Sequence, residues 1–556
     1  MKMDMKELLQ NAIYQGAQQA IKDGVFSAEV LPTIMLEVPP KMEFGDFATN
    51  FAMQAAKAAK TNPRVIAEAI VERMQETWLE KAVIAGPGFI NFYLKSEWLY
   101  NMLGDILAQG DNYGNSLSGG NQRVQVEFVS ANPTGPLHVG HGRGAAVGSA
   151  LVNLLRAAGY DVASEFYIND AGNQIDNLAA SVNARYLELL GQVVEFPADG
   201  YHGQDIIGTA QGIIDKDGDR YLELSVEERL ATFKGIALAE KLAALKIDLA
   251  AFNVQFDVWF SECSLHENNA LSETRQVLQD NGSIYESEGA LWLKSTAYGD
   301  DKDRVVIRDN GIPTYLAADI AYHRNKLERG FDQLINIWGA DHHGYICRVK
   351  AAIASLGYRP EQLEVLIVQM VSLYRSGQLV KMSKRTGQSV TLSELIEEVG
   401  TDAARFFFIM RSLDSQLDFD LDLAKKSSSE NPVYYIQYAH ARIASIFRQL
   451  AETGITLGDI DNTNLSLLTS DYETELIRKL GEYQEEVSSA AKERAPHYIT
   501  CYVHDLAGLF HSFYNHCHIN GVDPDLQQAR MALVKAVQTT IRHALTILGI
   551  SAPEKM

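Results

Sequence analysis

The sequence predicts a multidomain α/β protein. Its centre is a Rossmann-like parallel sheet, with an α+β domain before it and an all-α domain after it. A strand–helix–strand pattern runs from residue 124 to 168, as in doubly wound parallel sheets. An amphipathic helical opening and a glycine-rich turn with its strand precede this pattern, and the chain after Asn431-Pro432 is strongly helical. The length of 556 residues suits three or more domains.

Composition indicates a soluble chain of a reducing compartment, and we expect a cytoplasmic protein. The N-terminus is charged and shows no secretion signal, and no apolar run approaches the length of a membrane span. The net charge of −22 argues against a nucleic-acid partner, but it does not exclude one, because cations can gather on one face. Four scattered cysteines argue against a disulfide framework: Cys263, Cys347, Cys501 and Cys517.

The first predicted domain covers residues 1–115. Its clearest strand, residues 89–94, follows a Gly-Pro-Gly turn. The segment from 110 to 120 is polar and rich in glycine, which is typical of a domain boundary. The second domain is predicted over residues 121–375, interrupted by a helical insertion at about 185–300.

The most informative motif of this second domain follows its first strand, residues 124–129. A turn rich in Pro and Gly leads into a helix that starts near His138 and ends near Gly159. His138 and His141 share one face of that helix, so both can donate hydrogen bonds to one phosphate at the positive end of the helix dipole. Gly140 lets a flat adenine lie against the backbone. The motif predicts an ATP phosphate site.

Other interpretations of this motif remain open at this point. A single histidine is most often an ordinary packed or surface residue. Residues 140–145 also match a dinucleotide fingerprint, with Glu165 near the end of the next strand as a ribose acceptor. A dehydrogenase, however, would place its first glycine directly after the strand, whereas a long loop intervenes here.

A second motif, Lys381-Met382-Ser383-Lys384-Arg385, lies in the segment predicted as a loop with connecting helices over residues 376–430. A turn is expected at residues 375–377, and Thr391 with Glu394 predicts a capping box at a helix start. Three cations in five residues can be a solvated basic loop. They also suit the neutralisation of a pyrophosphate leaving group.

Together the two motifs resemble the paired signatures of class I aminoacyl-tRNA synthetases. The flanking sequence is similar in particular to the arginyl-tRNA synthetase family, from near residue 30 to the end of the chain. The similarity is carried by residues 126–141, 166–174, 339–345 and 551–556. It implies a ligase of protein biosynthesis that activates L-arginine with ATP and transfers the arginyl group to the 3′-terminal ribose of its tRNA, releasing AMP and pyrophosphate. It also implies a monomer.

The resemblance also implies site residues. ATP, accompanied by Mg²⁺, would be bound by His138, Gly140, His141, Gly142, Lys381, Met382, Ser383 and Lys384, with His138, His141, Lys381 and Lys384 as the catalytic groups. Arginine would be bound by Glu127, Ser130, Asn132, Tyr315, Asp319 and His342. Glu127 and Asn132 would hold its α-amino end, and Tyr315 and Asp319, four apart on one helix face, its guanidinium. Asp341 is an alternative to His342.

The same resemblance implies a tRNA-elbow-contacting N-terminal domain and an α-helical anticodon-binding domain over residues 431–556. Expected tRNA contacts are Phe44, Asn50, Tyr435, Tyr438 and Arg442, although aromatic stripes of this kind are most often core. The cysteines and histidines of residues 501–518 fit no standard zinc spacing, so neither zinc nor another protein-bound metal is expected. A non-catalytic tRNA-binding protein on the same scaffold is the remaining rival, and the intact histidine and lysine motifs argue against it.

Overall fold

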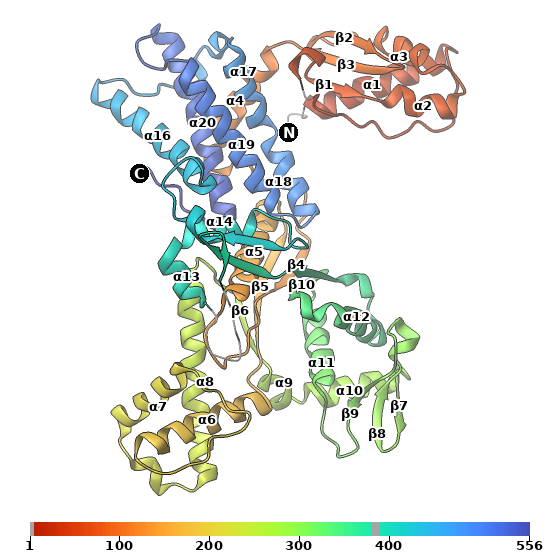
Figure 1. Cartoon of the computed structure of the whole chain (residues 1–556). Coiled ribbons are helices and arrows are strands. Elements are labelled where there is room, and N and C mark those ends of the chain that lie inside the picture. The colour runs from red at the N-terminus through yellow and green to blue at the C-terminus, as the bar shows by residue number, and fades with distance from the viewer. Residues whose placement is uncertain (1–4, 40, 381–389) are drawn as a thin grey trace. The chain divides into compact units, whose positions relative to one another are not determined.

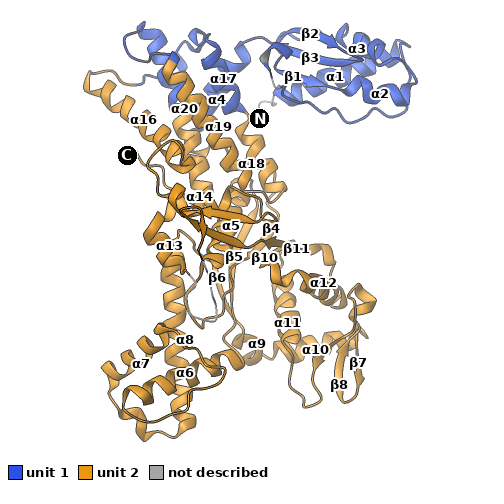
Figure 2. Cartoon of the chain, viewed as in Figure 1, with its two compact units in different colours: residues 1–109, 457–481, 516–536 blue, residues 110–456, 482–515, 537–556 orange. Residues whose placement is uncertain are grey.

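The computed structural model describes residues 5–39, 41–380 and 390–556, and the chain divides into two compact units (Figures 1 and 2). Unit 1 comprises residues 1–109, 457–481 and 516–536. Unit 2 comprises residues 110–456, 482–515 and 537–556. Each unit therefore combines segments that are distant in the sequence.

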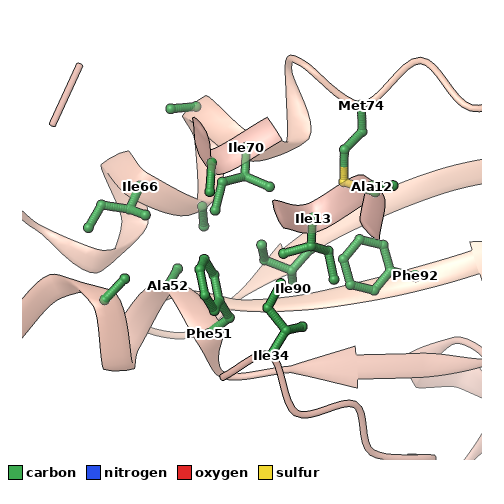
Figure 3. Close-up of a cluster of buried hydrophobic side chains, with 14 of the residues drawn as sticks. Ala12, Ile13, Ile34, Phe51, Ala52, Ile66, Ile70, Met74, Ile90 and Phe92 are labelled. Carbon is green, nitrogen blue, oxygen red and sulfur yellow. The ribbon is translucent and has the colours of Figure 1, made fainter. Parts of the chain in front are cut away.

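Unit 1 contains a small antiparallel sheet with strand order β1-β3-β2. Helices pack against this sheet around a core of aliphatic and aromatic side chains that includes Ile13, Phe51, Ile70 and Phe92 (Figure 3). The elements are α1 (Met5–Lys22), β1 (Phe47–Thr49), α2 (Phe51–Ala59), α3 (Pro63–Val71), β2 (Leu79–Ala85) and β3 (Phe89–Leu94).

The later segments of unit 1 are helical. They comprise α4 (Glu97–Gln109), α17 (Asp471–Gly481) and the first part of α20 (Pro524–Leu548). Arg478 on α17 pairs with Asp46, which lies just before β1, at 2.6 Å. Asp46 is 8% exposed and also accepts a hydrogen bond from the backbone N–H of Leu94 at 2.7 Å. This buried carboxylate therefore joins the small sheet to a helix that is far away in the sequence.

The centre of unit 2 is a five-stranded parallel sheet with strand order β11-β10-β4-β5-β6. The chain moves from β4 to β5 on one side and later returns to place β10 on the other side of β4, so the winding direction reverses between β4 and β10. Ligands of open α/β sheets bind beyond the carboxyl ends of the strands at such a point. The strands are β4 (Arg123–Glu127), β5 (Asp161–Ile168), β6 (Val258–Ser261), β10 (Gln333–Gly339) and β11 (Leu363–Val368).

The segment expected as a helical insertion, at about 185–300, is not helical throughout. β6, within that range, belongs to the core sheet, and β7 (Ile284–Ser287) and β8 (Ala290–Leu293) form an antiparallel sheet with β9 (Arg304–Ile307). The glycine at 289 has a φ of 76°, which suits the tight turn between β7 and β8. The helices from α5 to α12 are α5 (Val139–Ala157), α6 (Asn173–Leu189), α7 (Gln204–Asp217), α8 (Val226–Ala251), α9 (Cys263–Glu267), α10 (Ala270–Asp280), α11 (Tyr315–Glu328) and α12 (Ile346–Ser355).

After the core sheet, β12 (Val371–Arg375) pairs with β13 (Gln378–Leu379) and β14 (Leu417–Asp420). The predicted turn is confirmed, because Ser376 and Gly377 both have positive φ in the two-residue hairpin loop. The predicted capping box of Thr391 and Glu394 is also confirmed. The helices that follow in unit 2 are α13 (Leu392–Val399), α14 (Thr401–Ile409), α15 (Leu421–Ala424), α16 (Pro432–Glu452), α18 (Tyr483–Lys492) and α19 (His497–His516).

These elements confirm the predicted fold class: a parallel α/β core, an α+β N-terminal part and a helical C-terminal part (Figure 1). The predicted start of α16 is confirmed, with Asn431 as N-cap and Pro432 as the first helical residue. Within the described residues, no helix is both long enough and apolar enough to cross a membrane.

Candidate active site

The histidine motif lies at the carboxyl end of β4, where the winding of the core sheet reverses. β4 ends at Glu127, residues 128–138 form the connecting loop, and His138 is the N-cap of α5. The helix start predicted near His138 is therefore confirmed. Because α5 begins at this edge of the sheet, its first unpaired N–H groups and its positive dipole end lie there as well. This edge is suited to bind an anion.

The two histidine rings are stacked, with centroids 3.7 Å apart and planes inclined by 20°. His138 Nδ1 accepts a hydrogen bond from the Gly140 N–H at 3.1 Å, and His141 Nδ1 accepts one from the His138 N–H at 3.3 Å. A neutral imidazole that accepts at Nδ1 carries its proton on Nε2. The helix cap thus selects the tautomer in which each Nε2 is the donor, as hydrogen bonding to phosphate oxygens requires.

Two glycines of the motif have different surroundings. A Cβ at Gly140 would lie 3.0 Å from His138 Cε1, so a side chain there would press on the first histidine ring. A Cβ at Gly142 would lie 2.9 Å from a methyl group of Leu392 and 3.2 Å from the ring of Phe408. Gly142 is therefore needed for the close packing of α5 against α13 and α14, a role that the sequence pattern did not indicate.

The segment after the lysine motif is bonded directly to the histidine loop. The Val139 N–H donates to the Val390 carbonyl at 3.2 Å, and the Leu392 N–H donates to the Leu137 carbonyl at 2.8 Å. The lysine-motif residues predicted from sequence lie outside the described residues: Lys381, Met382, Ser383 and Lys384. Residues 390–392, which the structure describes, contact the histidine loop in a strand-like manner.

Arg143, one turn into α5, ties this helix to the same region. Its guanidinium is fully buried and donates to the carbonyls of Gln369, Ser412 and Ser415 at 2.8–2.9 Å. Burial lowers the pKa of Arg143 to about 10, so the group stays charged at neutral pH. These bonds hold the histidine helix to the loops that precede β12 and β14.

The predicted arginine-binding residues Glu127 and Ser130 contact each other. Ser130 Oγ donates to Glu127 Oε1 at 2.9 Å and accepts from the Tyr167 N–H at 3.1 Å. Val129 and Ser130 have φ angles of 67° and 40°, in the left-handed region that β-branched residues in particular avoid. Such strain costs about 1–3 kcal/mol and persists where surrounding bonds impose it, most often at functional sites.

Asp319 and Tyr315 lie on α11, as predicted, one turn apart. Tyr315 is 60% exposed, whereas Asp319 is half-buried and accepts a hydrogen bond from the hydroxyl of Tyr345. Burial, as the largest cause, and the negative charges of Glu127 and Glu262 together raise the pKa of Asp319 to about 7, although the Tyr345 bond opposes them. These carboxylates thus influence one another, and a bound cation would relieve their repulsion.

Two other predicted arginine-binding residues are more exposed. Asn132 lies on the loop between β4 and α5 and is exposed. The His342 side chain is 58% exposed, with Nε2 at 3.6 Å from Asp341 Oδ2 and its ring centroid 6.1 Å from that of Trp338. Both belong to segments that follow the carboxyl ends of core strands, β4 and β10 respectively.

Three groups of this acidic site were not predicted from the sequence. Tyr345 lies within the similar segment 339–345, so a signal for it existed. Glu262, 7% exposed, follows β6, and burial raises its pKa. Lys326 is fully buried and donates to Glu127 Oε2 at 2.5 Å. Neither Glu262 nor Lys326 stands in a local motif, so only their spatial position reveals them.

The dinucleotide interpretation does not fit the structure. Glu165, the candidate ribose acceptor, is fully buried. Its carboxylate accepts hydrogen bonds from Tyr322 at 2.6 Å and from two nitrogens of Arg329 at 2.6 and 3.0 Å. A side chain with these partners and no exposed surface cannot reach a ribose.

The predicted tRNA contacts of unit 1 lie near the small sheet. Phe44 ends a short 3-10 helix, Met42–Phe44, and is 44% exposed. Asn50 is half-buried before α2, and its side chain accepts a hydrogen bond from Gln54 at 2.9 Å. The exposure of Phe44 favours a contact surface over the core position that aromatic residues often take.

The predicted tRNA contacts of unit 2 lie on α16. Arg442 donates to the Tyr438 hydroxyl at 2.8 Å, and its guanidinium lies 4.5 Å and 4.7 Å from the ring centres of Tyr438 and Tyr514. A cavity of about 470 Å³ is lined by Tyr438, Arg442 and Tyr514 together with the last three residues, 554–556. Tyr435 lies beside His504 and His511 instead, with ring centroids 5.4 and 4.6 Å away. Tyr438 and Arg442 therefore line this cavity, whereas Tyr435 does not.

Within the part of the chain that the structure describes, no group of three or more His, Cys, Asp or Glu side chains is arranged to hold a metal ion. The four cysteines are free thiols.

Three family models match the chain. Residues 7–94 match the arginyl-tRNA synthetase N-terminal domain, residues 102–414 match the class I (R) tRNA synthetase catalytic domain, and residues 436–556 match the DALR anticodon binding domain. The chain is 54% identical to the arginine–tRNA ligase of Carboxydothermus hydrogenoformans over 97% of each chain. It is 53% identical to that of Geobacillus thermodenitrificans over 99% of each. The structure of Thermus thermophilus arginyl-tRNA synthetase has a similar fold, with a TM-score of 0.76, 24% identity and full coverage of both chains.

Proposed function

Because the chain belongs to the arginyl-tRNA synthetase family, we infer that it activates L-arginine with ATP and transfers the arginyl group to its tRNA. In the first step the arginine carboxylate attacks the α-phosphate of ATP and pyrophosphate leaves. In the second step the terminal ribose hydroxyl of the tRNA attacks the arginyl carbonyl and AMP leaves. No protein side chain serves as a covalent nucleophile, so catalysis rests on alignment and charge stabilisation. The single observation that carries this function is the acidic site at the carboxyl end of β4, next to the stacked histidines.

The phosphates of ATP bind, in this proposal, at the start of α5. The Nε2 tautomer of His138 and His141 supports it, because each ring presents a donor at a helix N-terminus. Lys381 and Lys384 neutralise the departing pyrophosphate, with Met382 and Ser383 in the same motif. The bonds from residues 390–392 to the histidine loop support this assignment, because those residues follow the lysine motif closely in the sequence. Mg²⁺ enters with ATP as part of the substrate.

Arginine binds with its guanidinium at Asp319, in this proposal. The raised pKa of that carboxyl and its bond to Tyr345 support the assignment, because a rigid fork of donors is best met by closely placed acceptors. Tyr315 meets the guanidinium from the same helix, and Ser130 and His342 line the approach. Glu127 and Asn132 hold the α-amino end, as the family resemblance implies. Both carboxylate oxygens of Glu127 accept hydrogen bonds, so a bound amine would share an acceptor with Ser130 or Lys326.

The tRNA is bound by both units in this proposal. The cavity of Tyr438 and Arg442 accepts an anticodon base, because an arginine held between two aromatic rings offers a flat cationic surface for stacking. Tyr435 acts from the neighbouring turn of α16. Phe44 and Asn50 contact the tRNA from residues 1–115. We assign residues 431–556 to anticodon binding and residues 121–375 to catalysis.

We further propose a monomer that works in the cytoplasm. Four free cysteines that form no disulfide support a reducing compartment. Size-exclusion chromatography with light scattering tests the monomer, for which the expected mass is 61.6 kDa.

ATP–pyrophosphate exchange tests the proposed function. The full-length protein is assayed with each of the standard amino acids, with and without tRNA that accepts arginine. Exchange with arginine alone among the amino acids is the expected result, and its dependence on tRNA decides whether tRNA gates the first step. Absence of exchange under every condition would favour the non-catalytic tRNA-binding interpretation.

The pH dependence follows from Asp319. Its pKa of about 7, raised first by burial, means that the free enzyme holds this carboxyl protonated below neutral pH. A protonated carboxyl loses its charge-assisted bonds to a guanidinium, so kcat/KM for arginine is expected to fall about tenfold per pH unit below pH 7. The profile is measured by pyrophosphate exchange at saturating ATP. A flat profile down to pH 5.5 would exclude Asp319 as the titrating group.

The anticodon cavity is tested by Tyr438→Ala. Because stacking contributes about 1–3 kcal/mol per base, the KM for tRNA in aminoacylation is expected to rise about tenfold or more. Tyr498→Ala is the matched control: Tyr498 lies on α19 and is 37% exposed, against 38% for Tyr438. An equal effect of both substitutions would show that the cavity is not a base site.

A further inference from the structure

The acidic arginine site contains a buried cation of its own. Lys326 on α11 has no exposed surface. Its Nζ donates to Glu127 Oε2 at 2.5 Å and to Asn336 Oδ1 at 3.0 Å, and lies 4.3 Å from the ring centre of Tyr322. A buried ion pair rarely adds net stability, since an apolar pair of similar volume is often as stable or more so. The charge of Lys326 therefore calls for an explanation beyond packing.

A chain of hydrogen bonds links this lysine to the predicted guanidinium site. Asn336 Oδ1 accepts from Lys326, and its Nδ2 lies 3.0 Å from His323 Nε2. His323 Nδ1 lies 2.8 Å from the carbonyl oxygen of Asp319, which can only accept, so Nδ1 carries the proton and Nε2 accepts from Asn336. Burial, as the largest cause, and the charge of the neighbouring lysine together lower the pKa of His323 to about 3, so this ring stays neutral. The direction of every bond in the chain is thus determined.

The charges around the site come from several elements. The carboxylates are Glu127 at the end of β4, Glu165 on β5, Glu262 after β6 and Asp319 on α11. The other titratable or charged groups are Tyr167, Tyr322, His323, Lys326, Arg329 and Tyr345. Arg329 is paired with Glu165, to which it donates two hydrogen bonds. Among the described contacts of Glu127, Lys326 supplies the positive charge.

We propose that Lys326 is a positioning residue for arginine binding: its ammonium holds the Glu127 carboxylate in place and supplies a positive charge to the acidic site that Glu127 forms with Asp319. Glu127 also orients Ser130 through its second oxygen, so the lysine acts on the whole strained segment after β4. Lys326 does not contact the substrate itself and acts on it only through Glu127, Ser130 and Asp319. This inference rests on the proposed function, since it concerns how the same site holds arginine.

The effect on Asp319 gives a readout that a merely structural role would not produce. Burial and the charges of Glu127 and Glu262 raise the pKa of Asp319, and the positive charge of Lys326 opposes them. Removing that charge lets the pKa of Asp319 rise. The acid limb of the pH profile, the range in which kcat/KM for arginine falls as the pH is lowered, therefore moves to higher pH. A residue that served only in packing would change stability and leave this limb in place.

The test uses Lys326→Met, which removes the charge and keeps an unbranched side chain. In pyrophosphate exchange with full-length protein and tRNA, the acid limb of kcat/KM for arginine is expected about half a pH unit or more above wild type. The KM for arginine is expected to rise about tenfold, with a smaller change in kcat and in the KM for ATP. Lys326→Arg keeps the cation, so its acid limb should coincide with that of wild type even where its KM differs.

The unpaired Glu127 of the Met variant could prevent folding. Lys326→Gln covers this case, because its amide can still donate a hydrogen bond to Glu127 while it lacks the charge, and the same shift is expected. Lys241→Met is the matched control: Lys241 on α8 is 5% exposed, and its Nζ lies 2.8 Å from Asp205 Oδ2, outside the arginine site. This control should lower the melting temperature and leave the acid limb unchanged.

The outcomes distinguish a failure of the Lys326 proposal from a failure of the proposed function. A folded Met or Gln variant with the wild-type acid limb and the wild-type KM for arginine would overturn the role of Lys326. A wild-type protein without arginine-dependent exchange would instead overturn the proposed function. A shifted limb in Lys326→Met or Lys326→Gln, absent from Lys241→Met, would establish Lys326 as the group that controls the ionisation of the site.

Discussion

Replacing Asp319 with Asn is expected to lower kcat/KM for arginine about a thousandfold in pyrophosphate exchange. The substitution preserves the shape of the side chain and the acceptor for the Tyr345 hydroxyl, but it removes a charge from a half-buried position beside the buried carboxylates Glu127 and Glu262. Breaking a buried, hydrogen-bonded charge pair costs about 3–5 kcal/mol, which corresponds to two to four powers of ten. The loss should appear mainly in the KM for arginine, while the KM for ATP stays near its wild-type value.

A control on the same helix separates this effect from a general disturbance of α11. Glu328→Gln neutralises a carboxylate whose side chain is 48% exposed and pairs with Arg324 at 2.8 Å. Exposed pairs contribute less than about 1 kcal/mol, so this variant should keep kcat/KM within a few-fold of wild type. If Asp319→Asn retained the wild-type efficiency with arginine, the guanidinium would have to bind elsewhere, with Glu262 as the next candidate.

The second large effect is expected for Lys384→Ala. Loss of a positive charge that acts on the departing pyrophosphate should lower kcat of arginine activation about a hundredfold to a thousandfold, with little change in the KM for arginine. Arginine-dependent exchange measured at saturating ATP gives kcat, and a titration of arginine gives the KM. Equal activity in the variant would remove this lysine from the mechanism.

The matched control for this lysine is Lys426→Ala. Lys426 is exposed, follows α15 and pairs with Glu430 at 2.5 Å. Its removal should leave kcat of activation within a few-fold of wild type. A large loss in both variants would indicate a general electrostatic effect on ATP binding in place of a specific role for the lysine motif.

Local features of the fold could be read from the sequence because their causes are local. Thr391 with Glu394 makes a capping box from four consecutive positions, and Asn431-Pro432 starts a helix by its own backbone preferences. The strand–helix–strand unit from 123 to 168 also follows from periodicity and turn residues. The insertion was harder to predict, because β6 becomes a strand only by pairing with β5.

The sequence by itself determined the fold class, the family and the position of the histidine motif at the end of a strand. The tertiary structure decided which charges meet in the arginine site. Lys326 and Glu127 are 199 positions apart, and Tyr345 and Asp319 come together from β10–α12 and α11. It also decided that Glu165 is a buried partner of Arg329. Contacts of this kind depend on how α11 packs against the sheet, and that packing results from the burial of many side chains together, so no short pattern encodes it.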